Sequence, residues 1–174
     1  DGFLMKLNSS GIQWSTYLGG TLTDYALAVA VDGSGNPVVV GYTTAPDFPT
    51  TTGAYDRIQD NTEAFAMKFD GAGALIWSTF LGGTNTDYGQ AVAVDSGGNV
   101  YVGGYTFSSN FPIVGGFDAT LSTTPDGFVV KLNPSGTGIV WSSYLGGNDT
   151  DYVQGIAVDG AGNTYVTGYT YSTD

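Results

Sequence analysis

The sequence contains no cysteine and no histidine, and only four of its 174 residues are lysine or arginine. These absences exclude disulfide frameworks, zinc fingers, c-type haem attachment and nucleophile systems that depend on Cys or on a Ser–His pair. Sixteen acidic residues give a net charge of −12, which would repel nucleic acid, because its binding depends on Lys and Arg. No apolar run reaches the length of a membrane-spanning helix, and no signal peptide is recognisable.

Glycine and aromatic residues, in contrast, are abundant. Glycine accounts for 28 of the 174 residues, more than double its usual share, and 14% of the residues are aromatic, including 12 tyrosines. This composition supplies enough apolar surface for a core, so we expect one β-rich domain and not a disordered linker. Since the first residue is Asp1, we also expect either a removed leader or excision from a longer chain.

A repeat of about sixty residues dominates the sequence. The motif Trp-Ser-Ser/Thr-Tyr/Phe-Leu-Gly-Gly occurs three times, beginning at Trp14, Trp77 and Trp141. The segments Thr-Asp-Tyr, Ala-Val-Asp and Gly-Tyr-Thr recur at nearly the same offsets, so the repeat covers essentially the whole chain. We divide it into units of about 1–25, 26–88, 89–152 and 153–174, of which the first and last are half units, within one propeller segment, 1–174.

Each unit reads as two β-hairpins. Residues 28–32 and 37–42 alternate in character around a Gly/Ser/Asn turn, and residues 3–8 and 12–18 do the same around Gly11. A connection of about twenty residues joins the two hairpins and gives four strands per unit. We therefore predict an all-β fold of three four-stranded antiparallel propeller blades, one of them split between the chain ends; a solenoid is the alternative, although its repeats are usually shorter.

The first strand of each unit has one small and one bulky face. Ala28 and Ala30 share one face and Val29 and Val31 the other, and the later repeats keep this pattern. We expect these to be the innermost strands, with the bulky face of one packing on the small face of its neighbour. The predicted core consists of Val29, Val31, Val92, Val94, Ile156, Val158 and, between blades, the structural tryptophans Trp14, Trp77 and Trp141.

The third repeat carries a family resemblance. It contains Tyr-Leu-Gly-Gly from Tyr144, Asp151-Tyr152, Ile-Ala-Val-Asp from Ile156, Gly-Asn from Gly162 and Tyr-Val-Thr-Gly-Tyr-Thr from Tyr165. In these motifs the sequence resembles the SBBP-type β-propeller repeat. The resemblance implies four-stranded blades, a secreted or cell-surface bacterial or archaeal protein, and no enzymatic activity. Three units are too few for an ordinary closed propeller.

Three of the four basic residues occupy the same position in each unit: Lys6, Lys68 and Lys131. A ring of ammonium groups could bind an anion, but a chain of net charge −12 repels anions. We favour a structural role, in which each lysine pairs with an aspartate that follows a first strand. Those aspartates are Asp32, Asp95 and Asp159.

A second repeated position, in the Asp-Tyr pair, is acidic: Asp24, Asp87 and Asp151. Oxygen-rich loops of this kind could hold Ca²⁺, whereas a transition metal is not expected without His or Cys. We favour the interpretation that these carboxylates accept backbone N–H bonds and shape turns. We therefore expect no cofactor, with Ca²⁺ as the possible exception. The single glutamate, Glu63, and the absence of a phosphate loop or nucleophile elbow argue against an enzyme.

The strand count leaves a half blade at each end, and the two unpaired sheet edges invite strand addition. We expect assembly through Phe3, Met5 and Leu7 at one end and Tyr165, Val166 and Tyr169 at the other. The predicted function is an extracellular or cell-surface structural module that joins head to tail, as copies or adjoining repeats, into a ring or filament. The alternative is a glycan-binding propeller, in which connector aromatics stack on sugars: Tyr55, Phe48, Phe111 and Phe117.

Overall fold

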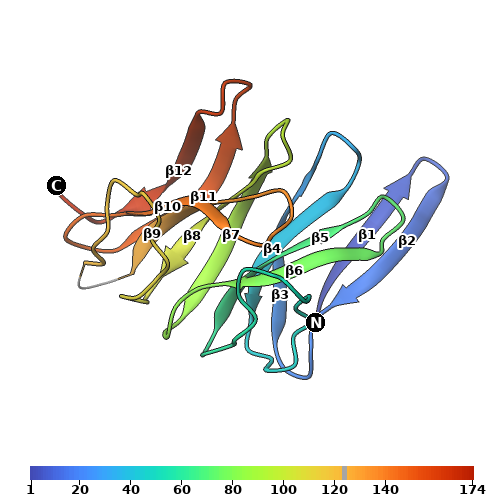
Figure 1. The fold of residues 1–174 in the computed structure, drawn as a ribbon, viewed down its shortest axis with the longest axis horizontal. Coiled ribbons are helices and arrows are strands. Elements are labelled where there is room, and N and C mark those ends of the chain that lie inside the picture. The colour runs from blue at the N-terminus through green and yellow to red at the C-terminus, as the bar shows by residue number, and fades with distance from the viewer. Residues whose placement is uncertain (123–124) are drawn as a thin grey trace.

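The computed structural model describes residues 1–122 and 125–174, and the strands of this part of the chain are all antiparallel (Figure 1). The strands are β1 (Gly2–Asn8), β2 (Gly11–Leu18), β3 (Asp24–Val31), β4 (Pro37–Thr43), β5 (Glu63–Phe69), β6 (Leu75–Leu81), β7 (Asp87–Val94), β8 (Val100–Thr106), β9 (Asp126–Leu132), β10 (Ile139–Leu145), β11 (Asp151–Val158) and β12 (Thr164–Thr170). None of the described segments forms a helix that could cross a membrane. The predicted all-β fold is confirmed.

The strands form two complete blades and two half blades. Strands β3 to β6 make one four-stranded sheet and β7 to β10 the next, each in sequence order, while β1–β2 and β11–β12 are separate hairpins. Each first strand begins two residues before the unit boundary expected from the repeats, because Asp24, Asp87 and Asp151 already pair with the last residue of the following strand.

The sheets stand side by side in an open row. Figure 1 shows β1–β2 (blue) at one end, β11–β12 (red) at the other and the two complete sheets between them. Strand β7 packs against β3 on one side and β11 on the other, so the first strands are neighbours, as innermost strands of propeller blades are.

The core lies between the sheets. One cluster joins the two complete sheets and includes Val38, Val40, Phe128 and Tyr144. Ala28, on the small face of β3, and the bulky-face residues Val92 and Val94 of β7 pack against this cluster, which agrees with the expected packing of bulky on small faces.

The prediction that Val29 and Val31 are buried is wrong. They are 57% and 62% exposed, whereas Val92, Val94, Ile156 and Val158 are half-buried. The bulky face of β3 points toward the β1–β2 hairpin, which contains only the third and fourth strands of a blade. The first and second strands that would cover Val29 and Val31 are therefore not beside them.

The tryptophans also differ from one another in burial. Trp77 is buried, as predicted, but Trp14 and Trp141 are only half-buried. Trp77 stands between the two complete sheets, while the other two belong to sheets that adjoin a half blade or end the row. Burial of the same repeat position therefore depends on how complete its neighbours are.

Candidate functional site

The lysines of the complete sheets form ion pairs within their own blades. Lys68 Nζ lies 2.9 Å from Asp32 Oδ2, and Lys131 Nζ lies 3.6 Å from Asp95 Oδ2. Burial acts to raise the pKa of Asp32, but the bonds from Lys68 and from the N–H groups of Ser34 and Asn36 hold it well below its ordinary value. Lys68 and Lys131 are thus engaged with carboxylates, which argues against a ring of lysines that binds anions.

In the two half blades, the lysine and the aspartate of this ion pair lie at opposite ends of the chain. Lys6 of β1 donates to the carbonyl of Gly71 at 3.0 Å, and Asp159 accepts bonds from Asn163 and Tyr165 in its own hairpin. Neither residue forms an ion pair within the described ranges. The half blades therefore carry one member each of the pair that every complete blade contains.

The repeated Asp-Tyr aspartates are buried and hydrogen-bonded at the Gly-Gly corners. Asp24 accepts a bond from the N–H of Gly20 at 2.9 Å and one from the Thr43 hydroxyl at 2.5 Å, and the bond of Gly147 N–H to Asp151 follows the same pattern. Asp87 is held by Gly83, Thr106 and Ser108. These contacts favour the turn-shaping role. The part of the chain that the structure describes contains no cluster of three metal-ligating side chains, and Ca²⁺ binding stays a prediction.

A buried carboxyl pair was not anticipated from the sequence. Glu63 is only 1% exposed, and its Oε2 has no hydrogen-bond partner among the described residues. A Cβ on Gly82 would touch both Glu63 Oε2 and Asp87 Oδ2, which places the two carboxyls together. Burial, followed by the charge of Asp87, raises the pKa of Glu63 to about 9, and burial raises that of Asp87 to about 6. This pair is closed to substrates, so it gives no support to a hydrolase site.

A row of tyrosines crosses the molecule and was also missed, although the Asp-Tyr and Gly-Tyr-Thr repeats carry its signal. Its members in order are Tyr25, Tyr42, Tyr88, Tyr105, Tyr152 and Tyr169. Stacked pairs within a blade alternate with edge contacts between blades, with ring centroids 4.3 to 4.9 Å apart. The rings cover one another's faces, which leaves little flat surface for a sugar.

Trp14 and Trp77 each pack on the hairpin turn of the next sheet in the row. The indole N–H of Trp14 donates to Gly71 at 3.1 Å, and that of Trp77 donates to Pro134 at 3.1 Å. Gly136, with a φ of 68°, lies so close to Trp77 that a Cβ would be 2.5 Å from the ring. Trp141 has no following turn within the described chain and instead meets Tyr101 edge-on.

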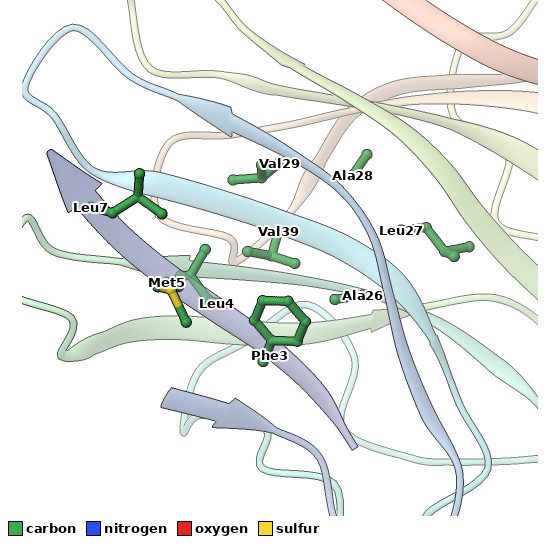
Figure 2. A pocket seen from close by; sticks show the side chains of 9 residues that line it. All are labelled: Phe3, Leu4, Met5, Leu7, Ala26, Leu27, Ala28, Val29 and Val39. Carbon is green, nitrogen blue, oxygen red and sulfur yellow. The ribbon is translucent and has the colours of Figure 1, made fainter. Parts of the chain in front are cut away.

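The residues expected to mediate assembly are exposed, whereas their counterparts in the complete blades are buried or half-buried. Phe3 and Leu7 are 65% and 66% exposed, and Met5 is 36% exposed. The same positions of β5 are buried. Figure 2 shows Phe3, Met5 and Leu7 along β1, beside Val29 and Val39 of the adjoining sheet, where they line an open apolar groove. At the other end Tyr165, Val166 and Tyr169 are exposed.

The connector aromatics do not form the common surface that glycan binding would need. Phe48 and Phe111 are buried, with ring centroids 4.6 Å from Phe65 and 4.5 Å from Phe128. Tyr55 is half-buried, and only Phe117, 79% exposed, is open to solvent. Phe48 and Phe111 are therefore not accessible for stacking on sugars, as the glycan-binding alternative requires, because both connectors fold back over their sheets.

Family comparison matches three stretches of the chain, 13–49, 76–112 and 140–174, to the SBBP β-propeller repeat, and together they make up more than half of it. The chain belongs to the SBBP β-propeller repeat family. This SBBP chain is also 25% identical over 188 aligned residues to an uncharacterized WD repeat-containing protein of Acanthamoeba polyphaga mimivirus. The alignment covers 92% of the chain but only 13% of that relative, so the chain spans a small part of the relative's length.

Proposed function

We propose that this chain is a non-enzymatic, extracellular or cell-surface structural module whose terminal hairpins are the two halves of one propeller blade. The β11–β12 hairpin supplies the first and second strands, and the β1–β2 hairpin supplies the third and fourth. Completion by the complementary hairpin, from another copy or from adjoining repeats, extends the row of blades into a ring or filament. The extracellular setting rests on the family resemblance alone.

The observation that carries this proposal is the contrast in exposure between equivalent strands. Phe65, Met67 and Phe69 of β5 are buried, while Phe3 and Leu7 of β1 are mostly exposed. Burial of one such side chain stabilises a protein by about 1.5–3 kcal/mol. A solvent-exposed apolar edge is also a site of uncontrolled association, which a folded protein normally covers.

The remaining features support a scaffold more than a ligand site. The repeated carboxylates form corners or ion pairs, and the Glu63–Asp87 pair is enclosed. The connector aromatics named for glycan binding lie mostly in the core. Glycan binding therefore remains the less supported alternative.

Sedimentation of the purified chain over a wide concentration range tests the proposal. We expect species at multiples of the 18.0 kDa chain mass, either a single dimeric species with six blades or a broad polymer distribution. Phe3→Asp should shift the chain toward monomer. Ile58→Asp, which changes an exposed apolar residue in the connector of the first complete sheet, should leave association unchanged. A chain that is monomeric at all concentrations would contradict the proposal.

A further inference from the structure

The contacts between complete blades give a template for the missing one. In β4 and β8, Gly41 and Gly104 stand opposite Phe65 and Phe128, and a Cβ on either glycine would lie within 3.0 Å of the partner ring. Gly168 is the equivalent residue of β12, and the three described atoms nearest to its Cβ position are all backbone atoms of β11. Phe3, the equivalent phenylalanine, is exposed at the other end of the chain.

The ion pair follows the same template. In the complete blades the lysine stands opposite the second residue of the second strand, as in Val38↔Lys68 and Tyr101↔Lys131, and reaches the aspartate that follows the first strand. The same register would place Lys6 opposite Tyr165 and within reach of Asp159. Each complete blade thus has one pair, and the two half blades together have one more.

The contact between tryptophan and turn gives a third match. Trp14 and Trp77 each lie under a positive-φ glycine in the hairpin turn of the next sheet. Gly11, with a φ of 114°, occupies this place in the β1–β2 turn, yet no atom lies within 4 Å of its Cβ position. Trp141 is the one repeat tryptophan without such a turn in the described chain.

We infer that the partner of the split blade is a second copy of this chain, whose β1 pairs with β12 in a single register, with Phe3 opposite Gly168 and Lys6 opposite Tyr165. The inference rests on the proposed function and adds the partner and the contacts. Both members of all three matched contacts belong to this chain: Phe3, Lys6 and Gly11 lie in the β1–β2 hairpin, and their partners lie in the β11–β12 hairpin or, for Trp141, on the adjacent strand β10 at the other end of the row (Figure 1). The same register continues the tyrosine row from Tyr169 to Tyr25 of the next copy. The contact is heterologous, so each copy uses both of its ends.

A charge-exchange experiment tests this partner. Lys6→Asp and Asp159→Lys each place like charges across the contact, and each variant alone should associate at least about tenfold more weakly than the wild type. A mixture of the two variants should recover association. When copies of the two variants alternate along the assembly, every contact again joins one positive and one negative side chain. The double variant Lys6→Asp/Asp159→Lys should recover it in one chain. Arg57→Asp gives the same change in net charge as Lys6→Asp and is the control.

The register is tested separately with engineered cysteines, since the native chain has none. Met5 and Val166 would face each other, as Met67 and Val39 do in the complete blade. A chain with Met5→Cys and Val166→Cys should therefore form disulfide-linked multimers on mild oxidation. The control with Met5→Cys and Thr164→Cys, displaced by two residues, should form few.

The outcomes separate this inference from the proposed function. A wild-type chain that stays monomeric overturns both. A wild-type chain that assembles, but does so equally well after either charge reversal and links equally through both cysteine pairs, overturns the second-copy register and leaves blade completion by another hairpin standing. Loss of association in each single charge variant and recovery in the mixture supports the inference.

Discussion

Two junctions in this molecule are built from the same repeat but are covered to different extents. At the junction of the complete sheets, Val92 packs against a core cluster made of residues from both of these sheets. At the junction with β1–β2, Val29 occupies the same repeat position and is mostly exposed. The local sequences are nearly the same, so the difference arises from the strands on the opposite side. The comparison shows that burial in a stacked repeat is a property of pairs of units.

The largest difference in stability is expected between substitutions of Trp77, which lies between complete sheets, and Trp141, which lies beside a half blade. Trp77→Ala should lower the free energy of unfolding by about 3–5 kcal/mol, because it empties a filled site between complete sheets. Trp141→Ala should cost about 1 kcal/mol or less in the monomer, because Trp141 is half-buried and has no turn above it. Chemical denaturation at low protein concentration measures both. Equal losses would contradict the contrast.

The next largest difference in stability is expected between substitutions of the equivalent lysines Lys68 and Lys6. Lys68→Ala leaves the carboxylate of Asp32 without its partner in a nearly buried setting, and we expect a loss of about 3 kcal/mol. Lys6→Ala removes an exposed lysine and should change the monomer by less than about 0.5 kcal/mol. Denaturant midpoints at low protein concentration compare the two, and a large effect of Lys6→Ala in monomers would contradict this account.

Turn glycines give a smaller contrast. Gly136→Ala should destabilise the chain by about 2 kcal/mol, from positive-φ strain together with overlap with Trp77. Gly11→Ala meets open space, so we expect about 1 kcal/mol from strain alone. Thermal melts of dilute protein test the order. If Gly11→Ala costs as much as Gly136→Ala, the space over Gly11 is not open in solution.

The last contrast concerns pH. Burial raises the pKa of Glu63 from 4.5 to about 9, so the native chain keeps a proton that the unfolded chain releases. The free energy of unfolding should therefore fall as pH rises from about 4.5 toward 9, and Asp87 adds to this fall between 3.8 and about 6. Glu63→Gln should flatten the slope, because an amide cannot release the proton, and its gain in stability over the wild type should grow as pH rises above about 4.5. Asp1→Asn, at the same repeat position of the open hairpin, should leave the slope unchanged.

Much of the fold could be predicted because its signals are local. Alternation within a strand and a Gly/Asn/Ser turn between strands define each hairpin, and the repeat of the Trp-Ser motif counts the blades. The pairing of Lys68 with Asp32 was also foreseen, because both residues recur once in each unit. These features depend on residues of a single unit.

The features that were missed depend on neighbouring units. Val29 looks like Val92 in the sequence, and only the missing strands of the preceding blade make it exposed. Glu63 and Asp87 belong to different blades, so neither segment alone predicts that they meet. Phe48 stands in a polar connector, and its burial follows from the path of that connector over the sheet.

The contact of β7 with both β3 and β11 has a further consequence for how the chain opens. Among the described residues, the main contacts between sheets join nearest neighbours, so the stability of each sheet is the sum of its intrinsic stability and of the interfaces that it shares. The central sheets share two interfaces and the terminal hairpins one. Amide hydrogens should therefore exchange most slowly in β4, β5, β8 and β9 and most rapidly in β1 and β12. Local unfolding should therefore begin at the two terminal hairpins, and a hairpin that gains a neighbouring sheet is no longer the least stable part of the row.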